Sequence, residues 1–339
     1  MLMTSEYKNR FYIASEKSTK KAIVLLQMGG PNSLKEINDF LYNLFIDPYL
    51  IQLPFYLRPF QSKLAKFISN RRQKKVIPQY ELIGGRSPIV ENTIKFGLQL
   101  HAIFEEKYHP IDIAVAMRYS LPRAIDSVKL LKKRKINEIL LVPLYPHYSH
   151  STAGSSIKDF KDEAKKENFS VKLIEFRDWG FEKFYLNWWI HQIKLELERS
   201  QLKDTKLLFT AHGLPQSYID KGDTYKESVV NATKSIMENF PGIDWELSFQ
   251  SRVGRQKWME PYTKDKIRDY STLCNTNLVV IPIGFISDHL ETLYELDILY
   301  RNQFIQNKDN TFSRVKVPNA SADFAYGMAE FISSKGDKL

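Results

Sequence analysis

The chain has 339 residues, 43% of them hydrophobic and 26% charged, with a formal net charge of +10. This length exceeds one minimal domain and fits one large or two medium α/β lobes with buried cores. The charge would suit a nucleic acid, an anionic membrane or an anionic small molecule, but no zinc-finger or RNA-binding signature accompanies the lysine runs, so we expect no nucleic-acid partner.

Short β-branched or leucine-rich runs predict buried strands of parallel sheets. In chain order these runs are Ala22–Leu26, Ile111–Met117, Glu138–Val142, Val171–Glu175, Leu207–Thr210, Glu246–Gln250 and Leu278–Ile283. Helical patterns lie between and after them, at Leu34–Phe45, Thr93–Lys107, Pro122–Lys133, Ser156–Glu167, Phe184–Ser200, Lys226–Asn239, Asp288–Ile305 and Asp323–Ser333. This alternation predicts an α/β fold with right-handed crossovers.

Two strands end in a similar way, which predicts two Rossmann-like lobes, each a parallel sheet flanked by helices. One runs into Met28-Gly29-Gly30-Pro31 and the other into Ala211-His212-Gly213. We expect a flexible leader over 1–20, an N-terminal lobe over 21–175 and a C-terminal lobe over 176–318. We expect 319–339 to form a helix that packs on the first lobe. Ligands of such sheets bind at the carboxyl ends of the strands, so a cleft between the lobes is the expected site.

His212 is the first candidate for chemistry, because it stands where a predicted buried strand ends. Such a strand end is a fixed platform, and an imidazole there can exchange protons near neutral pH or bind a metal. A histidine that only caps the loop fits this tripeptide as well. A second pair, His147 and His150, could also bind a metal, although the small residues after Tyr148 favour a loop.

The second candidate is the segment IPIGFISDHLETLYELD, residues 281–297. A strand ends there, Gly284 turns the chain, and a helix is predicted to begin near Asp288. Glu291 and Glu295 are four apart and share one helix face. Acids at a helix start are also stabilised by the helix dipole, so a structural role is open. The functional hypothesis is a line of proton acceptors and oxygen ligands for Fe²⁺ or a similar ion, with His212 and Glu291 as a mixed nitrogen–oxygen pair.

The third candidate is a basic and hydroxylic set in the first lobe, suited to holding carboxylates. Its members are Lys63, Arg71, Arg72, Tyr80, Ser87, Arg118 and Tyr119. The nearby segment Phe40–Phe60 is apolar and aromatic and is broken by Pro48 and Pro54. It is either a hydrophobic lip or an ordinary core helix. The chain lacks the G-x-G-x-x-G, Walker A, H-E-x-x-H and G-x-S-x-G motifs, which removes the usual support for nucleotide-driven, zinc-protease and serine-hydrolase functions.

With these residues assembled, the sequence resembles the ferrochelatase family of class II chelatases from about Ala22 to Ile332. The matching stretches are QMGGP (27–31), RR…QYELIGGRSP (71–88), MRYS (117–120), VPLYPHYSHSTAGSS (142–156), TAHGLPQSYIDKGDTY (210–225), FQSRVGRQKWMEPYT (249–263) and PIGFISDHLETLYELDI (282–298). Seven stretches in order at family-like spacing make the resemblance specific. It implies an enzyme, a lyase of haem biosynthesis that inserts Fe²⁺ into a porphyrin.

The resemblance also implies roles for individual residues. His212 matches the family histidine and Glu291 its partner acid, which together are the catalytic, metal-binding and proton-handling pair. A polar path from that pair to the surface matches Asp288, His289 and Glu295. The porphyrin-binding positions match Met28, Lys63, Arg72, Tyr80, Ser87, Arg118, Tyr119, Trp258 and Phe285.

Met28 bears on the choice of porphyrin. The coproporphyrin-using branch carries Tyr at this position, whereas QMGGP resembles the protoporphyrin branch. We therefore expect protoporphyrin IX as substrate and protohaem as product, with coproporphyrin III as the alternative. A non-catalytic porphyrin or haem carrier, and a cobalt or nickel chelatase for another tetrapyrrole, are the competing functions.

Cys274 is the single cysteine, which excludes a disulfide framework and a cysteine-ligated zinc or iron–sulfur site within one chain. We expect no tightly bound cofactor and no [2Fe–2S] cluster, since Fe²⁺ is a substrate. No run approaches the roughly 18 apolar residues of a membrane span, and residues 1–20 lack the apolar core of a secretory signal. We expect a cytoplasmic protein with peripheral contact to the inner membrane face through Phe40–Phe60. An upstream porphyrin-producing enzyme is an expected partner.

Overall fold

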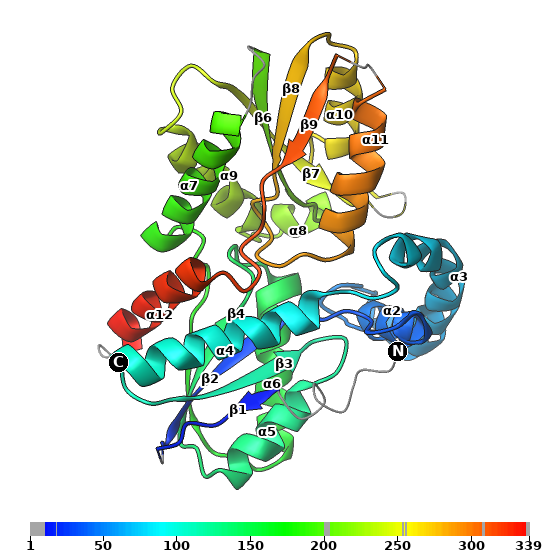
Figure 1. The fold of residues 1–339 in the computed structure, drawn as a ribbon. Helices are drawn as coiled ribbons and strands as arrows, with labels where there is room; N and C mark the ends of the chain where they lie inside the picture. Colours follow the sequence, from blue (N-terminus) through cyan, green and yellow to red (C-terminus); the bar gives the residue numbers. More distant parts are fainter. Residues whose placement is uncertain are drawn as a thin grey trace. The chain divides into compact units, whose positions relative to one another are not determined.

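The computed structural model describes residues 11–17, 19–199, 204–252, 254, 256–306 and 309–336. The chain forms two compact units. Unit 1 comprises Met1–Tyr145, Ser149–Arg177 and Asn319–Leu339, and unit 2 comprises Pro146–Tyr148 and Asp178–Pro318. Each unit has its own sheet with helices against it (Figure 1). The predicted α/β class with two parallel-sheet lobes is therefore confirmed.

The sheet of unit 1 has five strands in the order β1-β3-β2-β4-β5. Their bounds are β1 (Tyr12–Ile13), β2 (Lys21–Gln27), β3 (Asp112–Met117), β4 (Glu138–Pro143) and β5 (Lys172–Glu175). β2, β3, β4 and β5 are parallel to one another, whereas β1 pairs with β3 in the antiparallel sense. Residues 22–27 of β2 are all buried, because helices cover both faces of a central parallel strand; this burial explains the continuous apolar run.

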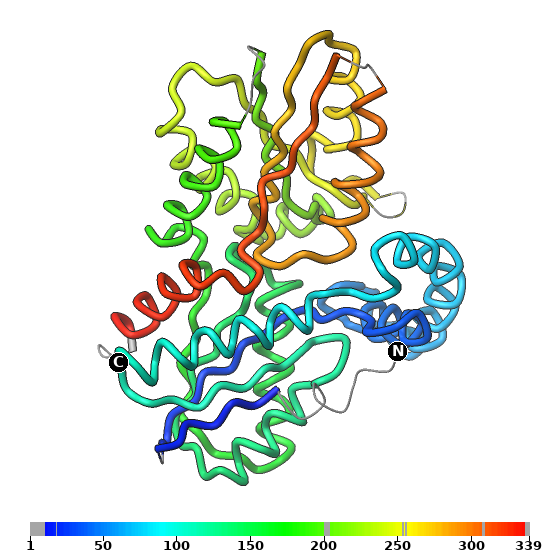
Figure 2. The backbone as a smooth tube through the Cα atoms, in the orientation of Figure 1, coloured from blue at the N-terminus to red at the C-terminus, as the bar shows by residue number. Residues whose placement is uncertain are grey.

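The helices of unit 1 follow the predicted alternation, with additions. They are η1 (Leu34–Glu36), α2 (Ile37–Phe45), η2 (Phe55–Phe60), α3 (Gln61–Leu82), α4 (Ile89–Lys107), α5 (Ala124–Lys133), the short π-helix η3 (His150–Gly154), α6 (Ser155–Lys166) and α12 (Ala322–Gly336). α12 lies beside α4, as Figures 1 and 2 show. The rings of Phe324 and Phe96 pack between the two helices, with centroids 6.0 Å apart. The last helix of the chain thus belongs to unit 1.

The leader expected to be flexible over 1–20 contains an ordered part. Tyr12–Ile13 pairs with β3, the Tyr12 hydroxyl donates to Asp112, and the backbone N–H of Ser15 donates to the other oxygen of Asp112 at 2.8 Å. Asp112 is fully buried, so these two donors satisfy a carboxylate that would otherwise be costly to bury. Residues 1–10 and 18 of the predicted leader lie outside the described residues.

Unit 2 contains a four-stranded parallel sheet in the order β7-β6-β8-β9. Its strands are β6 (Asp204–His212), β7 (Asp244–Gln250), β8 (Thr276–Ile281) and β9 (Thr311–Arg314). Its helices are α7 (Lys183–Arg199), α8 (Gln216–Asp220), α9 (Tyr225–Met237), α10 (Thr263–Ser271), the π-helix η4 (Glu291–Tyr300) and α11 (Arg301–Phe304). Leu208, Leu278 and Val280 of the sheet pack with Leu296 of η4 and Phe304 of α11 in one buried cluster.

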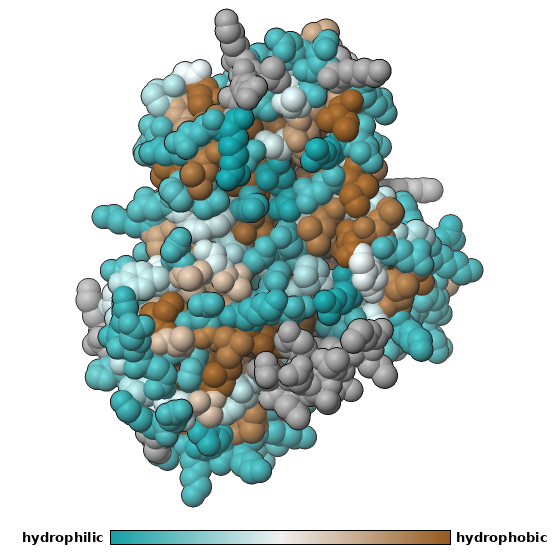
Figure 3. Space-filling model, in the orientation of Figure 1, coloured by the Kyte–Doolittle hydropathy of each residue, from teal (hydrophilic) through white to brown (hydrophobic). Residues whose placement is uncertain are grey.

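No helix among the described residues is both long and apolar enough to cross a membrane. On the face seen in Figure 3, hydrophobic side chains are interspersed with hydrophilic ones, and a hydrophobic group is visible over the α2–α3 part of unit 1.

Candidate active site

His212 is the last residue of β6, and its imidazole is held by its own backbone. Nδ1 lies 2.7 Å from the carbonyl oxygen of Gly213. A carbonyl oxygen can only accept, so Nδ1 carries the hydrogen and the neutral ring has Nε2 as its acceptor. The structure therefore fixes one tautomer at the end of a buried strand.

The surroundings of His212 keep this ring neutral. Burial lowers the pKa of His212; the negative charge of Glu291 and the hydrogen bond to Gly213 oppose that shift, and His289 adds to it. Because the net direction is downward, the imidazole is unprotonated at neutral pH. An unprotonated Nε2 can take up a proton or bind a metal ion.

The loop after His212 is held against the neighbouring strand β7. His212 is in register with Gln250, and the N–H of Gly213 donates to the carbonyl of Gln250 at 2.9 Å. A Cβ at Gly213 would lie 2.9 Å from that same oxygen, so only glycine permits this approach. The buried Trp258 ring lies edge-on to the His212 ring, with centroids 6.3 Å apart.

The acidic segment forms a π-helix, not the α-helix that the sequence predicts. η4 spans Glu291–Tyr300, so Asp288 and His289 lie before the helix, in the turn that follows β8. π-helical turns are rare and are frequently found at functional sites. Polarity at a spacing of four residues could not distinguish the two helix types, because side chains four apart lie near one another in both.

His289 is buried and bonded through both ring nitrogens. Nδ1 lies 2.9 Å from the carbonyl of Ser287, so Nδ1 carries a hydrogen. Nε2 lies 3.2 Å from Oε2 of Glu291. The ring also packs against the half-buried Phe285, with centroids 4.5 Å apart.

Glu295 is held from the end of β7. Its Oε2 accepts from Nε2 of Gln250 at 3.2 Å and from the hydroxyl of Ser251 at 3.0 Å. The same Gln250 amide donates to the backbone carbonyl of Glu291 at 3.3 Å. Gln250, only 2% exposed, thus links the loop of His212 to both acids of η4. The sequence hypothesis missed Gln250, although its position at the end of a strand next to β6 could have indicated it.

Asp288 is held by a buried arginine. Arg314 of β9 binds Asp297 through two hydrogen bonds of 2.7 and 2.8 Å and lies 3.2 Å from Oδ1 of Asp288. The hydroxyl of Thr292 donates to the same oxygen at 2.8 Å. Both contacts of Asp288 Oδ1 come from neighbouring side chains of the same unit, so the geometry favours a structural role for Asp288 over the expected place in a proton path.

The described residues contain no group of three or more His, Cys, Asp or Glu side chains placed to hold a metal ion. His212 and Glu291 together supply one nitrogen and one carboxylate. A substrate metal bound there would need its other ligands from the porphyrin or from water.

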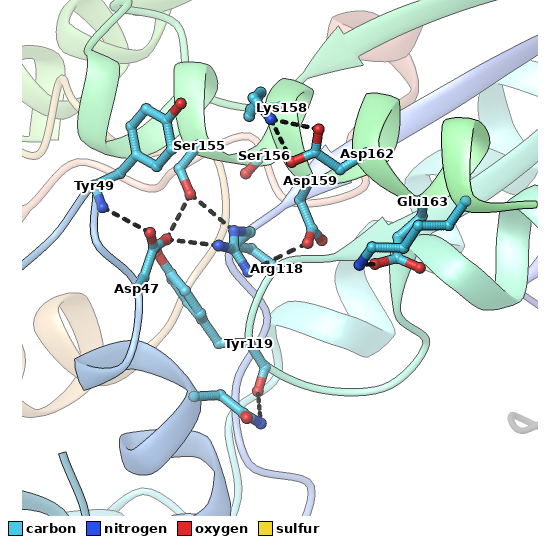
Figure 4. Close-up of polar contacts among 12 residues, drawn as sticks. Asp47, Tyr49, Arg118, Tyr119, Ser155, Ser156, Lys158, Asp159, Asp162 and Glu163 are labelled. Atoms are coloured by element: carbon cyan, nitrogen blue, oxygen red, sulfur yellow. Dashed lines mark hydrogen bonds and ion pairs between the residues drawn. The ribbon is translucent and has the colours of Figure 1, made fainter. Parts of the chain in front are cut away.

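In unit 1, Arg118 and Tyr119 belong to a buried polar cluster around Asp47. Asp47 accepts from the Tyr119 hydroxyl at 2.7 Å, from the Ser155 hydroxyl at 2.5 Å and from the N–H of Tyr49 at 2.8 Å. Figure 4 shows Arg118 between two carboxylates, 3.0 Å from Asp47 and 3.5 Å from Asp159.

Opposite charges face one another in this cluster, because the Arg118 guanidinium lies between the carboxylates of Asp47 and Asp159. Burial alone would lower the pKa of Arg118, but Asp47 and Asp159 outweigh it and raise that pKa. Burial and the negative charge of Asp47 raise the pKa of Tyr119 well above its ordinary value. Tyr119 is 4% exposed. Both side chains are already bonded inside the protein, which favours positioning over the predicted direct contact with porphyrin.

Met28 and Ser87 lie at the carboxyl end of the unit 1 sheet. The backbone N–H of Tyr119 donates to the carbonyl of Met28 at 3.0 Å, which joins the loops after β2 and β3. A Cβ at Gly30 would lie 2.6 Å from Cβ of Ser87, so the glycine allows Ser87 to pack against this loop. Met28 is half-buried and Ser87 is 4% exposed.

The porphyrin-binding residues predicted on α3 do not form one group. Lys63 and Arg72 are nine residues apart, which places them on opposite sides of the helix, about 180° apart. Lys63 is exposed, whereas Arg72 lies over the Phe45 ring at 5.6 Å. Tyr80 is 4% exposed.

The Phe40–Phe60 segment combines the two roles that its sequence left open. Phe40, Leu41 and Phe45 of α2 are buried in the manner of a core helix. Phe55 and Phe60 of η2 are 80% and 56% exposed, and Phe67 of α3 is 65% exposed. These three phenylalanines, with the exposed Tyr56 and Leu57, are called the apolar lip below.

Comparison with known proteins identifies the family of the chain. The Ferrochelatase family model matches residues 20–336. A ferrochelatase of Aquifex aeolicus is 39% identical over 320 residues, covering 93% of this chain and 99% of that protein. A ferrochelatase of Pelagibacter ubique is 39% identical over 326 residues, covering 94% and 92%.

Among solved structures, SirB from Bacillus subtilis with Fe³⁺ matches with a TM-score of 0.57 at 10% identity, over 94% of this chain and 98% of that one. Identity this low shows the fold alone. The family model and the curated relatives cover nearly the whole chain, including the segments of His212 and Glu291. The chain therefore belongs to the ferrochelatase family, lyases of haem and porphyrin biosynthesis.

Proposed function

We propose that the protein inserts Fe²⁺ into protoporphyrin IX to form protohaem, with His212 as the acceptor of pyrrole protons. Insertion breaks two pyrrole N–H bonds, forms four Fe–N bonds and releases two protons, without a change in the oxidation state of iron. The observation that carries the proposal is the His212 imidazole: its Nδ1–H is bonded to Gly213, and burial lowers its pKa. This ring is a neutral base with one acceptor nitrogen.

Glu291 is the proposed partner in both metal and proton handling. Its Oε2 lies 3.2 Å from Nε2 of His289, so a proton passed to the carboxylate can be shared with a second imidazole. Glu295 follows in the path, held by Gln250 and Ser251. We propose the path His212, Glu291, His289 and Glu295, with Asp288 as its ion-paired anchor rather than a carrier.

Two sets of side chains are proposed to hold the porphyrin, one for its propionates and one for its ring. Lys63, Arg72 and Ser87 are the proposed partners of its propionates, and Met28, Trp258 and Phe285 the proposed contacts of the ring. Distortion of a stiff macrocycle exposes its nitrogen lone pairs, and the energy for that distortion comes from such remote contacts. Arg118 and Tyr119 would support the porphyrin-binding residues of unit 1 through their contacts with Asp47.

Met28 supports protoporphyrin IX over coproporphyrin III, because the latter branch carries Tyr at the matching position. The test is anaerobic Fe²⁺ insertion, with Zn²⁺ as surrogate, into each porphyrin by the unaltered chain and by Met28→Tyr. We expect a preference for protoporphyrin that Met28→Tyr weakens. Turnover with coproporphyrin only would refute protoporphyrin IX as the substrate. Tight porphyrin binding without metal insertion would indicate a carrier instead of an enzyme.

We further propose that the apolar lip docks the protein on an anionic membrane surface from the cytoplasmic side. Next to the exposed phenylalanines, α3 carries exposed cations at Lys63, Lys66, Arg71, Lys74 and Lys75. Apolar side chains flanked by cations suit insertion among anionic headgroups.

Flotation with vesicles containing phosphatidylserine tests this contact. Binding should fall at least tenfold in Phe55→Ser/Phe60→Ser and stay unchanged in Leu98→Ser, which removes an exposed leucine from α4. Equal binding by the unaltered chain and both variants would refute the proposal that the apolar lip docks on the membrane.

The remaining proposed partners are the porphyrin, Fe²⁺ and an enzyme that supplies the porphyrin, with no nucleic acid. We propose no tightly bound cofactor. Cys274, the single cysteine, is exposed and supplies one thiolate, whereas a [2Fe–2S] cluster takes four such ligands.

A further inference from the structure

The peptide unit between His212 and Gly213 is held on two sides. Its N–H, from Gly213, donates to the carbonyl of Gln250 at 2.9 Å. Its carbonyl, from His212, accepts from the hydroxyl of Tyr225 at 3.0 Å. The next carbonyl, that of Gly213, accepts the Nδ1–H of the His212 ring at 2.7 Å. The Gly213 carbonyl belongs to the following peptide, so the hydrogen bonds that hold the His212–Gly213 peptide also restrain the residue that supplies the partner of the imidazole.

Tyr225 is itself firmly placed. It is the first residue of α9, is 7% exposed, and its backbone N–H donates to Asp223 at 3.0 Å. Its ring lies edge-on to the buried His147 ring, with centroids 6.4 Å apart. Burial raises the pKa of Tyr225 far above its ordinary value, so the hydroxyl keeps its proton and remains a donor.

A buried hydrogen-bond chain fixes α9 one turn further on. The Ser228 hydroxyl donates to Asp178 at 2.7 Å, so its oxygen accepts the Nδ1–H of His147 at 2.9 Å. His147 and Ser228 are 1% and 4% exposed. Since Ser228 lies three residues after Tyr225, these hydrogen bonds hold the same face of α9 that presents the Tyr225 hydroxyl.

Gly284, just after β8, lies close to the end of β6 and to the Tyr225 hydroxyl. A Cβ at Gly284 would lie 3.1 Å from Cβ of Ala211, a tight contact, and 3.4 Å from the hydroxyl, an ordinary one. The absence of a side chain at Gly284 therefore lets this turn approach Ala211, which precedes His212.

We propose that Tyr225 is a positioning residue for metal insertion, which holds the His212–Gly213 peptide and through it the rotamer and tautomer of His212. This inference rests on the proposed role of His212. Without the hydroxyl the peptide can turn, Gly213 withdraws its carbonyl, and the imidazole interchanges its tautomers. A small misplacement of a reacting group lowers the reaction rate by about 10- to 100-fold. Substrate binding is unaffected, because Tyr225 acts through His212 alone.

The test compares Tyr225→Phe with Tyr270→Phe. The control removes a buried hydroxyl of the same unit, one that donates to Glu246 at 2.6 Å, away from His212. We expect kcat for Zn²⁺ insertion to fall at least tenfold in Tyr225→Phe, with KM for porphyrin within twofold of the unaltered enzyme. Tyr270→Phe should lower the melting temperature about as much as Tyr225→Phe does, and it should leave kcat unchanged.

A second measurement needs no turnover. In protein labelled with ¹⁵N-histidine, the ring nitrogens of His212 should show one tautomer, protonated at Nδ1, and in Tyr225→Phe the averaged shifts of two tautomers. An unchanged kcat with unchanged shifts would overturn the inference, as would equal kcat losses in both variants. If the unaltered protein inserted no metal, the proposed function would fail, and the shifts alone would still decide the role of Tyr225.

Discussion

His147 offers a quantitative test of the core of unit 2, because it is a buried base that stays neutral. Its ring is 1% exposed, and burial lowers the pKa of His147 to about 3. Its carboxylate neighbour Asp178 bonds to the intervening Ser228 hydroxyl, and the rings of Tyr185 and Tyr225 face the imidazole. On unfolding, the pKa returns to about 6.5.

The sign and the magnitude follow from proton linkage. Below pH 6.5 the unfolded state binds a proton at His147 that the folded state excludes. The contribution of the neutral His147 to the free energy of unfolding is therefore complete above that pH, and it is lost as the pH falls toward the pKa of the folded state. Between pH 7 and pH 5 the loss for this one group is about 2 kcal/mol in the free energy of unfolding.

Urea unfolding at pH 7, 6 and 5 measures this loss, with His147→Asn as the matched variant. The asparagine amide can donate to Ser228 in place of Nδ1 and does not titrate. We expect the unaltered chain to lose about 2 kcal/mol more than His147→Asn over this range. Parallel stability curves for the two proteins would refute the claim that His147 is buried in the neutral form.

Three further substitutions test the candidate site and its support. Glu291→Gln should lower kcat about 100-fold by removing a proton acceptor, while Glu238→Gln, exposed at the end of α9, should not change it in the same insertion assay. Asp47→Asn should cost about 3 kcal/mol in urea unfolding because it removes the nearer of the two carboxylates that face the Arg118 guanidinium; a cost below about 0.5 kcal/mol, typical of exposed pairs, would contradict the buried cluster. Gly213→Ala should cost about 1–3 kcal/mol and lower kcat, because its Cβ would meet the Gln250 oxygen at 2.9 Å; unchanged kcat and melting temperature would contradict the close approach.

The parallel strands were predictable because both of their faces are buried. Residues 22–27 and 208–211 are all buried, so Ala22–Leu26 is continuously apolar and Leu207–Thr210 nearly so, and neither run needs periodicity to be noticed. β9 was missed because its sequence, Thr-Phe-Ser-Arg, is mostly polar and it lies at the edge of the sheet.

α3 was missed because its buried stripe is narrow. Only Ala65, Ser69, Val76 and Tyr80 of its 22 residues are buried, and Pro78 interrupts the helical pattern. A helix with so few apolar contacts lacks the broad stripe on which sequence patterns rely. Neighbouring parts of unit 1, not its own periodicity, determine that it is helical.

The candidate site was predictable where a residue ends a strand and not where it acts from another element. His212 could be identified because it ends a buried strand, and Gln250 could have been, because carboxyl ends of neighbouring parallel strands meet at one edge. Tyr225 and Asp47 bond to residues 13 and 72 positions away, and no local pattern indicates such partners. The π-helical form of η4 depends on backbone hydrogen bonding that polarity does not encode.

The most direct test of the account is single-turnover, anaerobic insertion of Fe²⁺ into protoporphyrin IX by the unaltered chain, His212→Ala and His191→Ala. His191 is an exposed histidine of α7 in the same unit and controls for loss of an imidazole. The account predicts rapid insertion by the unaltered chain and His191→Ala, and a rate at least about 100-fold lower in His212→Ala with porphyrin still bound. Insertion by His212→Ala at the unaltered rate would contradict the central claim that His212 takes up the pyrrole protons.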